Sequence, residues 1–400
     1  MRLKAAATLC AILVLLASAL AGTEKVLYTF TGGSDGGNPV DVGSLVRDSA
    51  GNLYGTTEYE GSCGEGTVFQ LSNDGIETVL HSFCGADGSS PIASVIRDSS
   101  GDFYGTTIGG GSIGCGTTFK LSGSTLTTLH SFTCGGDGGS PLGVVLDKSG
   151  NLYGVANLGG TNNNGLVYEI SSSGQFSVIY TFCSVAGCAD GASPARGLVM
   201  DTAGSIYGTT VNGGAPSCVF GCGTVFKLSE GGNSWTETVL HTFTGRDGQY
   251  PVEITVSYQV NAGRRQLRLF GTTGEGGSGG DGTVFEMSQS KSGFKLTTIH
   301  NFTGNNGEYP YGELSLVKGK LFGTTNFAGS GGFGTVFRLT QTNRGWTADT
   351  LYSFTDGADG EEPEGGVIAD PAGNLYGTAP FGGNTACYPT GCGVVFEITP

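Results

Sequence analysis

The chain has 400 residues, of which 75 are glycine and only 13% are charged, and its formal net charge is −15 at pH 7. This composition favours many short strands joined by tight turns over long helices. The acidic balance excludes a protein that neutralises nucleic-acid phosphates with lysine and arginine clusters, so we expect no nucleic-acid partner.

Residues 1–21 have the pattern of a secretory signal peptide. A short basic region, "MRLK", is followed by an apolar run that ends in the small-residue sequence "ALA". A membrane anchor is the alternative, but the cleavage pattern and the repeat that starts at about Lys25 favour cleavage before Gly22. We therefore expect an extracellular or periplasmic protein with no membrane span after cleavage. Its net charge would then change from −15 to −17, because Arg2 and Lys4 are removed.

A unit of roughly fifty residues recurs along the rest of the chain. Its clearest run is "LYGTT" at Leu53, with counterparts that begin at Phe103, Leu152, Ile206, Leu269, Leu321 and Leu375. An apolar run and a hairpin turn precede it, while a glycine-rich loop, an alternating run such as "GTVFQL" and a last run such as "VLHSF" follow. Four strands per unit without helices predict a propeller blade.

The two ends of the chain predict how the ring closes. The repeats begin with "VLYTF" at Val26, which is a fourth strand without the preceding three, and end with "GVVFEI", a third strand without a fourth. We therefore predict an all-β fold, a seven-bladed β-propeller with four antiparallel strands per blade, as a single domain over residues 22–400. The N-terminal strand completes the last blade, and an insertion lengthens the first hairpin of blade 5.

The histidines of the chain all occupy one position of the fourth strand. They are His81, His130, His241 and His300, and the other blades carry Tyr28, Tyr180 and Tyr352 there. A catalytic base would occur once, whereas a position that accepts either residue is explained by packing plus one polar tip. We therefore predict no catalytic residue among them.

Ten cysteines remain after signal cleavage, which suits an oxidising compartment. Three close pairs and two pairs at matching repeat positions predict five disulfides: Cys183 with Cys188, Cys218 with Cys222, Cys387 with Cys392, Cys63 with Cys84, and Cys115 with Cys134. Zinc is the alternative for the "CVFGC" spacing, but no second pair follows at finger spacing. We expect neither a metal nor a cofactor.

A D-G-x-x-P sequence links each fourth strand to the next blade, with Asn306 replacing the aspartate once. This is turn chemistry, because an Asp or Asn side chain bonds its own backbone and glycine accepts a positive φ. A ring of carboxylates that binds a cation is the alternative, but the loops lack the dense oxygen ligands of a calcium site.

Several positions around these loops differ from blade to blade and form the candidate ligand-binding site. They carry aromatic and charged side chains in three consecutive loops, namely Arg246, Tyr250, Glu308, Tyr309, Tyr311, Glu361 and Glu362. The glycine-rich loops between second and third strands emerge on the same face. Varied side chains on a rigid ring are suited to recognition, although ordinary solvated loops would look the same.

The unit D-x-x-G-N-L-Y-G-T-T, followed by G-T-V-F and D-G-x-x-P, resembles the GloVer-type tandem repeat of secreted bacterial proteins, also described as choice-of-anchor repeat proteins. The resemblance spans nearly all of the chain after residue 21. It implies an extracellular repeat protein and supplies no catalytic residues.

We therefore expect a secreted monomer that binds a carbohydrate or cell-envelope ligand through its inter-blade loops. One rival is a propeller enzyme, a carbohydrate hydrolase or lyase that uses carboxylates such as Glu308 and Glu361. A second rival is a purely structural surface repeat protein. The aromatic side chains gathered on one face favour the binding protein over both.

Overall fold

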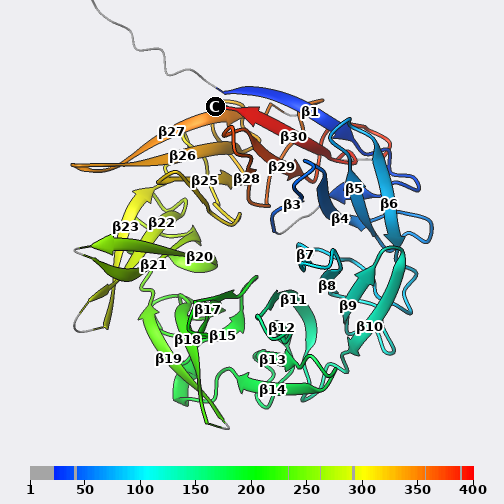
Figure 1. Cartoon of the computed structure of the whole chain (residues 1–400). Coiled ribbons are helices and arrows are strands. Elements are labelled where there is room, and N and C mark those ends of the chain that lie inside the picture. The colour runs from blue at the N-terminus through cyan, green and yellow to red at the C-terminus, as the bar shows by residue number, and fades with distance from the viewer. Residues whose placement is uncertain are drawn as a thin grey trace, which may run out of the picture.

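Seven antiparallel sheets stand in a ring in the computed structural model of the chain (Figure 1). The structure describes residues 22–39, 43–232, 234–261, 263–290, 293–355, 357–387 and 390–400. In six of the sheets the strands follow chain order from the axis to the rim, and in the seventh the order is β28, β29, β30 and then β1, so every sheet is one blade. The predicted seven-bladed propeller is confirmed. The predicted signal peptide at residues 1–21 lies outside the described residues.

The blades are numbered in chain order. Blade 1 contains β2 (Gly37–Pro39), β3 (Val46–Arg47), β4 (Leu53–Tyr59), β5 (Thr67–Leu71) and β6 (Glu77–Ser82). Blade 2 contains β7 (Ile96–Arg97), β8 (Phe103–Thr107), β9 (Thr117–Ser122) and β10 (Thr125–Ser131). Blade 3 contains β11 (Gly139–Leu146), β12 (Leu152–Leu158), β13 (Leu166–Ile170) and β14 (Phe176–Thr181), and a short 3₁₀ turn, η1 (Ala186–Cys188), follows it.

The remaining blades repeat the same order. Blade 4 contains β15 (Ala192–Pro194), β16 (Val199–Met200), β17 (Ile206–Asn212), β18 (Thr224–Gly231) and β19 (Ser234–Thr242). Blade 5 contains β20 (Gln249–Asn261), β21 (Arg264–Glu275), β22 (Thr283–Ser290) and β23 (Gly293–Asn301). Blade 6 contains β24 (Ser315–Val317), β25 (Lys320–Thr325), β26 (Thr335–Thr342) and β27 (Gly345–Ser353). Blade 7 contains β28 (Ile368–Ala369), β29 (Leu375–Ala379), β30 (Val394–Thr399) and β1 (Thr23–Thr29).

The N-terminal strand closes the ring as predicted. β1 pairs antiparallel with β30, in a register that runs from Thr23 opposite Thr399 to Thr29 opposite Val394. Figure 1 shows β1 on the rim beside β30, so the two ends of the chain share one sheet. The insertion in blade 5 is also confirmed, because β20 and β21 have 13 and 12 residues whereas the corresponding first strand of blade 2 has two.

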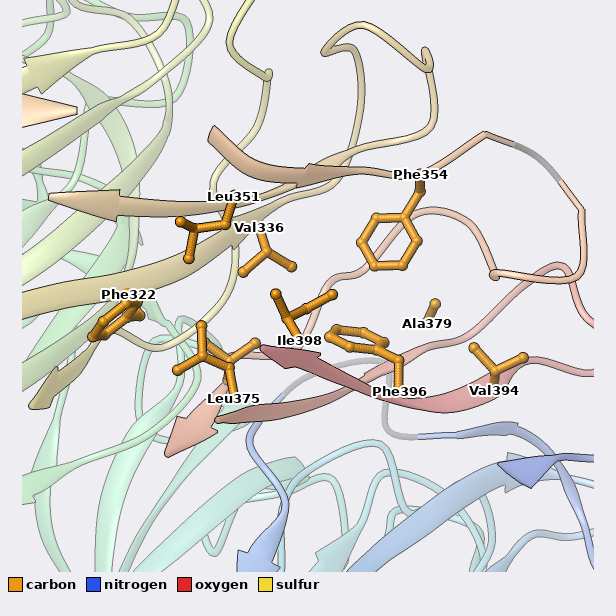
Figure 2. Packing of buried hydrophobic residues seen from close by; sticks show 10 residues of the cluster. Phe322, Val336, Leu351, Phe354, Leu375, Ala379, Val394, Phe396 and Ile398 are labelled. Atoms are coloured by element: carbon orange, nitrogen blue, oxygen red, sulfur yellow. The ribbon is translucent and has the colours of Figure 1, made fainter. Parts of the chain in front are cut away.

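An aromatic pair joins every blade to the next. The phenylalanine that ends each fourth strand packs edge-on against the third-strand aromatic ring of the following blade, with ring centroids 5.0–5.3 Å apart. Figure 2 shows one such interface, in which Phe354 of blade 6 faces Phe396 of blade 7 among other apolar side chains. Both rings are fully buried, and burial of a phenylalanine contributes about 2–3 kcal/mol.

The glycine of "LYGTT" makes room for these rings. A Cβ atom at Gly377 would lie 2.6 Å from Cζ of Phe396, and one at Gly208 would lie 2.6 Å from Cζ of Phe226. Such contacts are well inside van der Waals distance, so the third-strand ring can cross the second strand only over a glycine.

The fourth-strand histidines and tyrosines have a structural role. Each ring packs edge-on against the phenylalanine two residues later, as His81 does on Phe83 at 4.9 Å. Each polar tip bonds the Asp or Asn of its own D-G-x-x-P loop at 2.8–3.1 Å. The loop carboxylates are thus held against the outer strands and do not converge on the axis. Among the described residues, no three or more His, Cys, Asp and Glu side chains are placed to hold a metal.

Five disulfides join the cysteines in the predicted pairs. Two of them, Cys63–Cys84 and Cys115–Cys134, tie the loop before a third strand to the end of the fourth strand. The other three close short loops: Cys183–Cys188, Cys218–Cys222 and Cys387–Cys392. All ten cysteines of the described residues are therefore paired, which leaves none of them as a thiolate for the zinc alternative.

Candidate functional site

The backbone of the D-G-x-x-P loops is the same in all seven blades. The residue before the proline has a positive φ of 49–56°. Its N–H donates at 2.8–3.2 Å to a carbonyl in the loop before the third strand of the preceding blade. A non-glycine residue in this conformation costs about 1 kcal/mol. We call the face that carries these loops the loop face.

What differs between blades is the side chain on this strained position. Blades 1 to 4 place small polar residues there, namely Asn38, Ser90, Ser140 and Ser193. Blades 5 to 7 place Tyr250, Tyr309 and Glu362 there. Asn tolerates a positive φ well, whereas a bulky residue in this conformation is unusual and marks a position whose side chain is needed for something other than the turn.

A hollow of about 580 Å³ opens on the loop face between blades 2 and 6. We call it the mouth hollow. Three aromatic side chains, Phe220, Tyr250 and Tyr311, form its walls, and Arg196, Glu275, Asn157 and Asn212 supply its polar groups. Aromatic walls with a few polar groups are the usual make-up of a small-molecule site.

Tyr311 is positioned by its neighbours. Its ring lies against the backbone of β21, because a Cβ atom at Gly274 would be 2.5 Å from its Cε1 atom. The Tyr309 ring stacks on it at 6.0 Å and 18° between planes, and Phe327 packs edge-on against Tyr309 at 5.8 Å. Burial, and then the negative charge of Glu275, raises the pKa of Tyr311 above its usual value.

Phe220 enters the mouth hollow from the short loop closed by Cys218–Cys222. Its side chain is 73% exposed, and that of the neighbouring Val219 is 87% exposed. Sequence reasoning interpreted "CVFGC" only as a disulfide pair and missed Phe220. The available signal was an apolar dipeptide inside a constrained surface loop, which a disulfide alone does not need.

A smaller cavity of about 180 Å³ adjoins the mouth hollow, and we call it the channel cavity. Residues from blades 1 to 6 line it, which places it on the axis of the ring. Leu142 and Arg196 line both spaces. The charged side chains of the channel cavity are Arg196, Glu253 and Glu313.

The two channel carboxyls influence one another. Burial, and then repulsion from Glu313, raises the pKa of Glu253 well above its usual range, and Arg196 lowers it only partly. Burial also raises the pKa of Glu313, although Ser44 donates a hydrogen bond to it at 3.3 Å. Ionisation of both carboxyls is therefore disfavoured, because two neighbouring, partly buried like charges repel each other.

Arg196 connects this pair to a third carboxylate. Its Nη1 atom lies 4.0 Å from Oε2 of Glu364, which is an ion-pair distance but not a hydrogen bond. That Nη1 atom is buried and has no hydrogen-bond partner. The other oxygen of Glu364 accepts a hydrogen bond from Asn326 at 2.8 Å.

The predicted ligand-binding residues divide into two groups in the structure. Tyr250 and Tyr311 line the mouth hollow, and Tyr309 stacks on Tyr311. Four others lie in the same set of loops without lining the hollow: Arg246, Glu308, Glu361 and Glu362. Sequence reasoning missed Arg196, Glu253 and Glu313 altogether. Their signal was a charge at first-strand positions where other blades have alanine, glycine, serine or valine.

The structure gives no membrane-crossing helix: within the described ranges, none is long and apolar enough to span a bilayer. Sequence comparison matches the model of the Gloeobacter/Verrucomicrobia repeat to residues 16–220 and again to residues 196–400. Together the two matches cover most of the chain. No curated protein matches the sequence.

Solved structures with the same kind of fold are distant in sequence. An ancestral GH74 enzyme is 13% identical with a TM-score of 0.55, over 91% of this chain and 48% of that one. The extracellular domain of a one-component system from B. thetaiotaomicron is 10% identical with a TM-score of 0.52, over 95% of this chain and 42% of that one. This chain thus spans less than half of either structure, and at these identities the likeness shows the fold alone.

Proposed function

For this chain, which belongs to the Gloeobacter/Verrucomicrobia repeat family, we propose the function of an exported propeller that binds carbohydrate in the mouth hollow. The observation that carries the proposal is the wall of Phe220, Tyr250 and Tyr311 around polar groups. A sugar ring presents C–H faces that pack on aromatic rings, and hydroxyls that bond amides and charged side chains.

The strained position of Tyr250 supports this proposal. Serine occupies the same backbone position in blades 2 to 4, so the turn itself does not require an aromatic residue. Phe220 supports it too, since its ring is held out of the core by a disulfide-closed loop. Exposed aromatic side chains on rigid backbone bind at low entropic cost, because little conformational freedom is lost.

A glycan panel with the purified protein tests the proposal. The matched variants are Tyr250→Ser, which installs the residue of blades 2 to 4, and Phe220→Ser. Each should weaken binding roughly tenfold while the thermal midpoint stays unchanged. Val219→Ser, in the same loop but outside the mouth hollow, is the control and should bind as the wild type does. A panel with no bound glycan would overturn the proposal.

A carbohydrate-cleaving enzyme is the second candidate, because a carboxyl kept protonated near neutral pH can act as a general acid. The Glu253–Glu313 pair favours it. A reducing-end assay on each bound glycan decides between the two functions. Binding without new reducing ends supports the binding protein, and turnover abolished by Glu253→Gln supports the enzyme.

The disulfides and the N-terminal sequence support export as part of this proposal. Five disulfides form and persist in oxidising surroundings. Cleavage before Gly22 would leave this residue in contact with the fold, since its N–H donates to the carbonyl of Leu351 at 2.7 Å. N-terminal sequencing of protein recovered from the medium or periplasm should give Gly22 as the first residue, and an uncleaved N-terminus would contradict export by cleavage.

A further inference from the structure

We propose that the carbohydrate carries a free ammonium group, as in an amino sugar, and that this group binds where the mouth hollow meets the channel cavity. The inference rests on the function proposed above and names the class of ligand. The ammonium would lie between the Tyr311 ring and the carboxyls of Glu253 and Glu313, while the rest of the saccharide lies along Phe220 and Tyr250.

The charges around this junction favour a cation. Glu253 and Glu313 line the channel cavity, and Glu275 lines the mouth hollow. The one guanidinium of the two linings, that of Arg196, already lies at ion-pair distance from a further carboxylate, that of Glu364. Even with one proton on the channel pair, the balance of these groups is negative. A carboxylate sugar would meet this field and be repelled, whereas an ammonium would be attracted.

The raised pKa values of Glu253 and Glu313 are a sign of this field. Burial raises both, and for Glu253 the repulsion from Glu313 adds to burial while Arg196 offsets only part of the rise. An ammonium placed beside the pair supplies a further counter-charge and has three N–H donors for the carboxylate oxygens. Its binding therefore lowers the pKa of both carboxyls, and any proton that they hold passes to solvent.

The aromatic walls point to a cation independently of the carboxyls. A cation near the face of a tyrosine or phenylalanine is attracted by the ring quadrupole, and ammonium ligands are commonly bound among several such rings. Phe220, Tyr250 and Tyr311 line the mouth hollow. Tyr309 does not line it but stacks on the ring of Tyr311. Carboxyls next to aromatic faces are the combination that recognises an organic ammonium.

Arg196 serves the uncharged part of the ligand. The Arg196 side chain lies at the wall shared by the two spaces. A neutral hydroxyl or ring oxygen can accept a hydrogen bond from its guanidinium. Asn157 and Asn212, which line the mouth hollow, offer donors and acceptors for further hydroxyls.

Calorimetry with two matched probes tests the inference on the wild-type protein. The probes are the β-1,4 tetramer of glucosamine and its fully N-acetylated form, in which a neutral acetamido group replaces each ammonium group. The glucosamine tetramer should bind roughly tenfold more tightly in low salt, because hydrogen bonds to charged groups exceed neutral ones by about that factor. The preference should shrink at 1 M salt, where screening is strong.

The variants Glu253→Gln and Glu313→Gln test whether the preference for the glucosamine tetramer depends on these two carboxyls. The substitutions remove the charge and keep the side-chain volume nearly the same. Each should reduce the preference for the glucosamine tetramer to within about twofold. Titrations in two buffers of different ionisation heat should show proton release at pH 7 for the wild type and none for the double variant. Glu230→Gln, on the exposed end of β18, is the matched control and should change neither quantity.

The outcomes separate this inference from the function on which it rests. Equal binding of both tetramers, or tighter binding of the N-acetylated one, overturns the ammonium site and leaves carbohydrate binding in place. Loss of preference at high salt and release of a proton support the site even if a glutamine variant fails to fold. A protein that binds neither tetramer and no glycan of the panel overturns both.

Discussion

Glu77 of blade 1 is repelled by the carboxylate of Asp35, which lies in the loop before this blade. Asp35 accepts a hydrogen bond from the hydroxyl of Tyr28 in β1. Burial, and then repulsion from Asp35, raises the pKa of Glu77 to about 7. The same arrangement recurs for Glu237 with Asp190 and for Glu24 with Asp359. In all three, one carboxyl oxygen of the glutamate is buried without a hydrogen-bond partner.

These glutamates follow a rule that links neighbouring blades. The residue four positions before the fourth-strand His or Tyr depends on the fourth strand of the preceding blade. It is a glutamate when that strand carries the tyrosine. It is apolar when that strand carries the histidine, as at Leu126, Phe176, Leu296 and Ala348. A histidine ring has an apolar face to cover, and Phe176 stacks on His130 at 3.8 Å. Beside a tyrosine, a protonated glutamic acid is tolerated instead.

The stability of the protein should therefore fall as the pH rises through 7. A glutamate whose folded pKa is near 7 and unfolded pKa near 4.5 stabilises the fold fully below pH 4.5, and this contribution is lost above pH 7. After allowance for solvent screening, each site contributes about 1 kcal/mol. Thermal midpoints at pH 5.5 and 8.5 measure the fall, and Glu77→Gln should make it smaller. An unchanged fall in this variant would contradict the assignment.

Exchange of histidine for tyrosine should be tolerated. In His81→Tyr the new hydroxyl can reach Asp87, as Tyr28, Tyr180 and Tyr352 reach their own aspartates, so folding and ligand binding should stay within about 0.5 kcal/mol of wild type. His81→Ala removes the ring from Phe83 and leaves Asp87 without that donor, at a cost of about 1–3 kcal/mol. Denaturant titration of both variants measures the difference.

The glycine under each third-strand ring should be irreplaceable. Gly208→Ala places a Cβ atom 2.6 Å from Phe226 and 2.9 Å from Leu198, so we expect a loss of about 1–3 kcal/mol in the free energy of unfolding. Gly136→Ala is the control, because a Cβ atom there meets nothing within 4 Å and the backbone has no positive φ. Equal stability of the two variants would contradict the close packing of the Phe226 ring on Gly208.

Removal of the clasp strand should abolish cooperative unfolding. Deletion of residues 24–31 takes away β1 and exposes the edge of β30, together with the apolar cluster that Phe30 completes in blade 1. Deletion of residues 1–21 leaves β1 intact and should not change the thermal midpoint. A single sharp transition in the shorter protein would contradict closure by this strand.

The disulfides should differ in what they contribute. By the chain-entropy relation, removal of Cys115–Cys134, which spans 19 residues, should cost about 3 kcal/mol. Removal of Cys218–Cys222, which spans four, should cost about 2 kcal/mol. Unfolding of the paired Cys→Ala variants tests the order. Peptide mass mapping of the exported protein should find five bridges and no free thiol.

The sequence predicts the blades, the closure and the disulfide pairs because each depends on a pattern that recurs. "LYGTT" and "GTVF" repeat often enough to fix the second and third strands, and the incomplete units at the two ends imply that β1 joins β30. The charged residues of the channel cavity do not recur. Glu253 and Glu313 each directly precede the buried first-strand residue that packs on the second-strand glycine, where the other blades have serine or glycine, and Arg196 lies one position earlier in its own blade. Only the ring places them on one axis.

Closure by β1 also sets the order in which the molecule can be completed. β1 precedes every other strand of the ring in the chain and pairs with β30, which follows every other strand, so the ring stays open until β30 has been synthesised. Phe30 can pack before the ring closes, because the ring that it contacts, Phe69, belongs to blade 1 and lies only a few dozen residues further along the chain. Blade 1 can thus hold the N-terminal segment in place early, and the last event of folding is the arrival of β30 at a prepared edge.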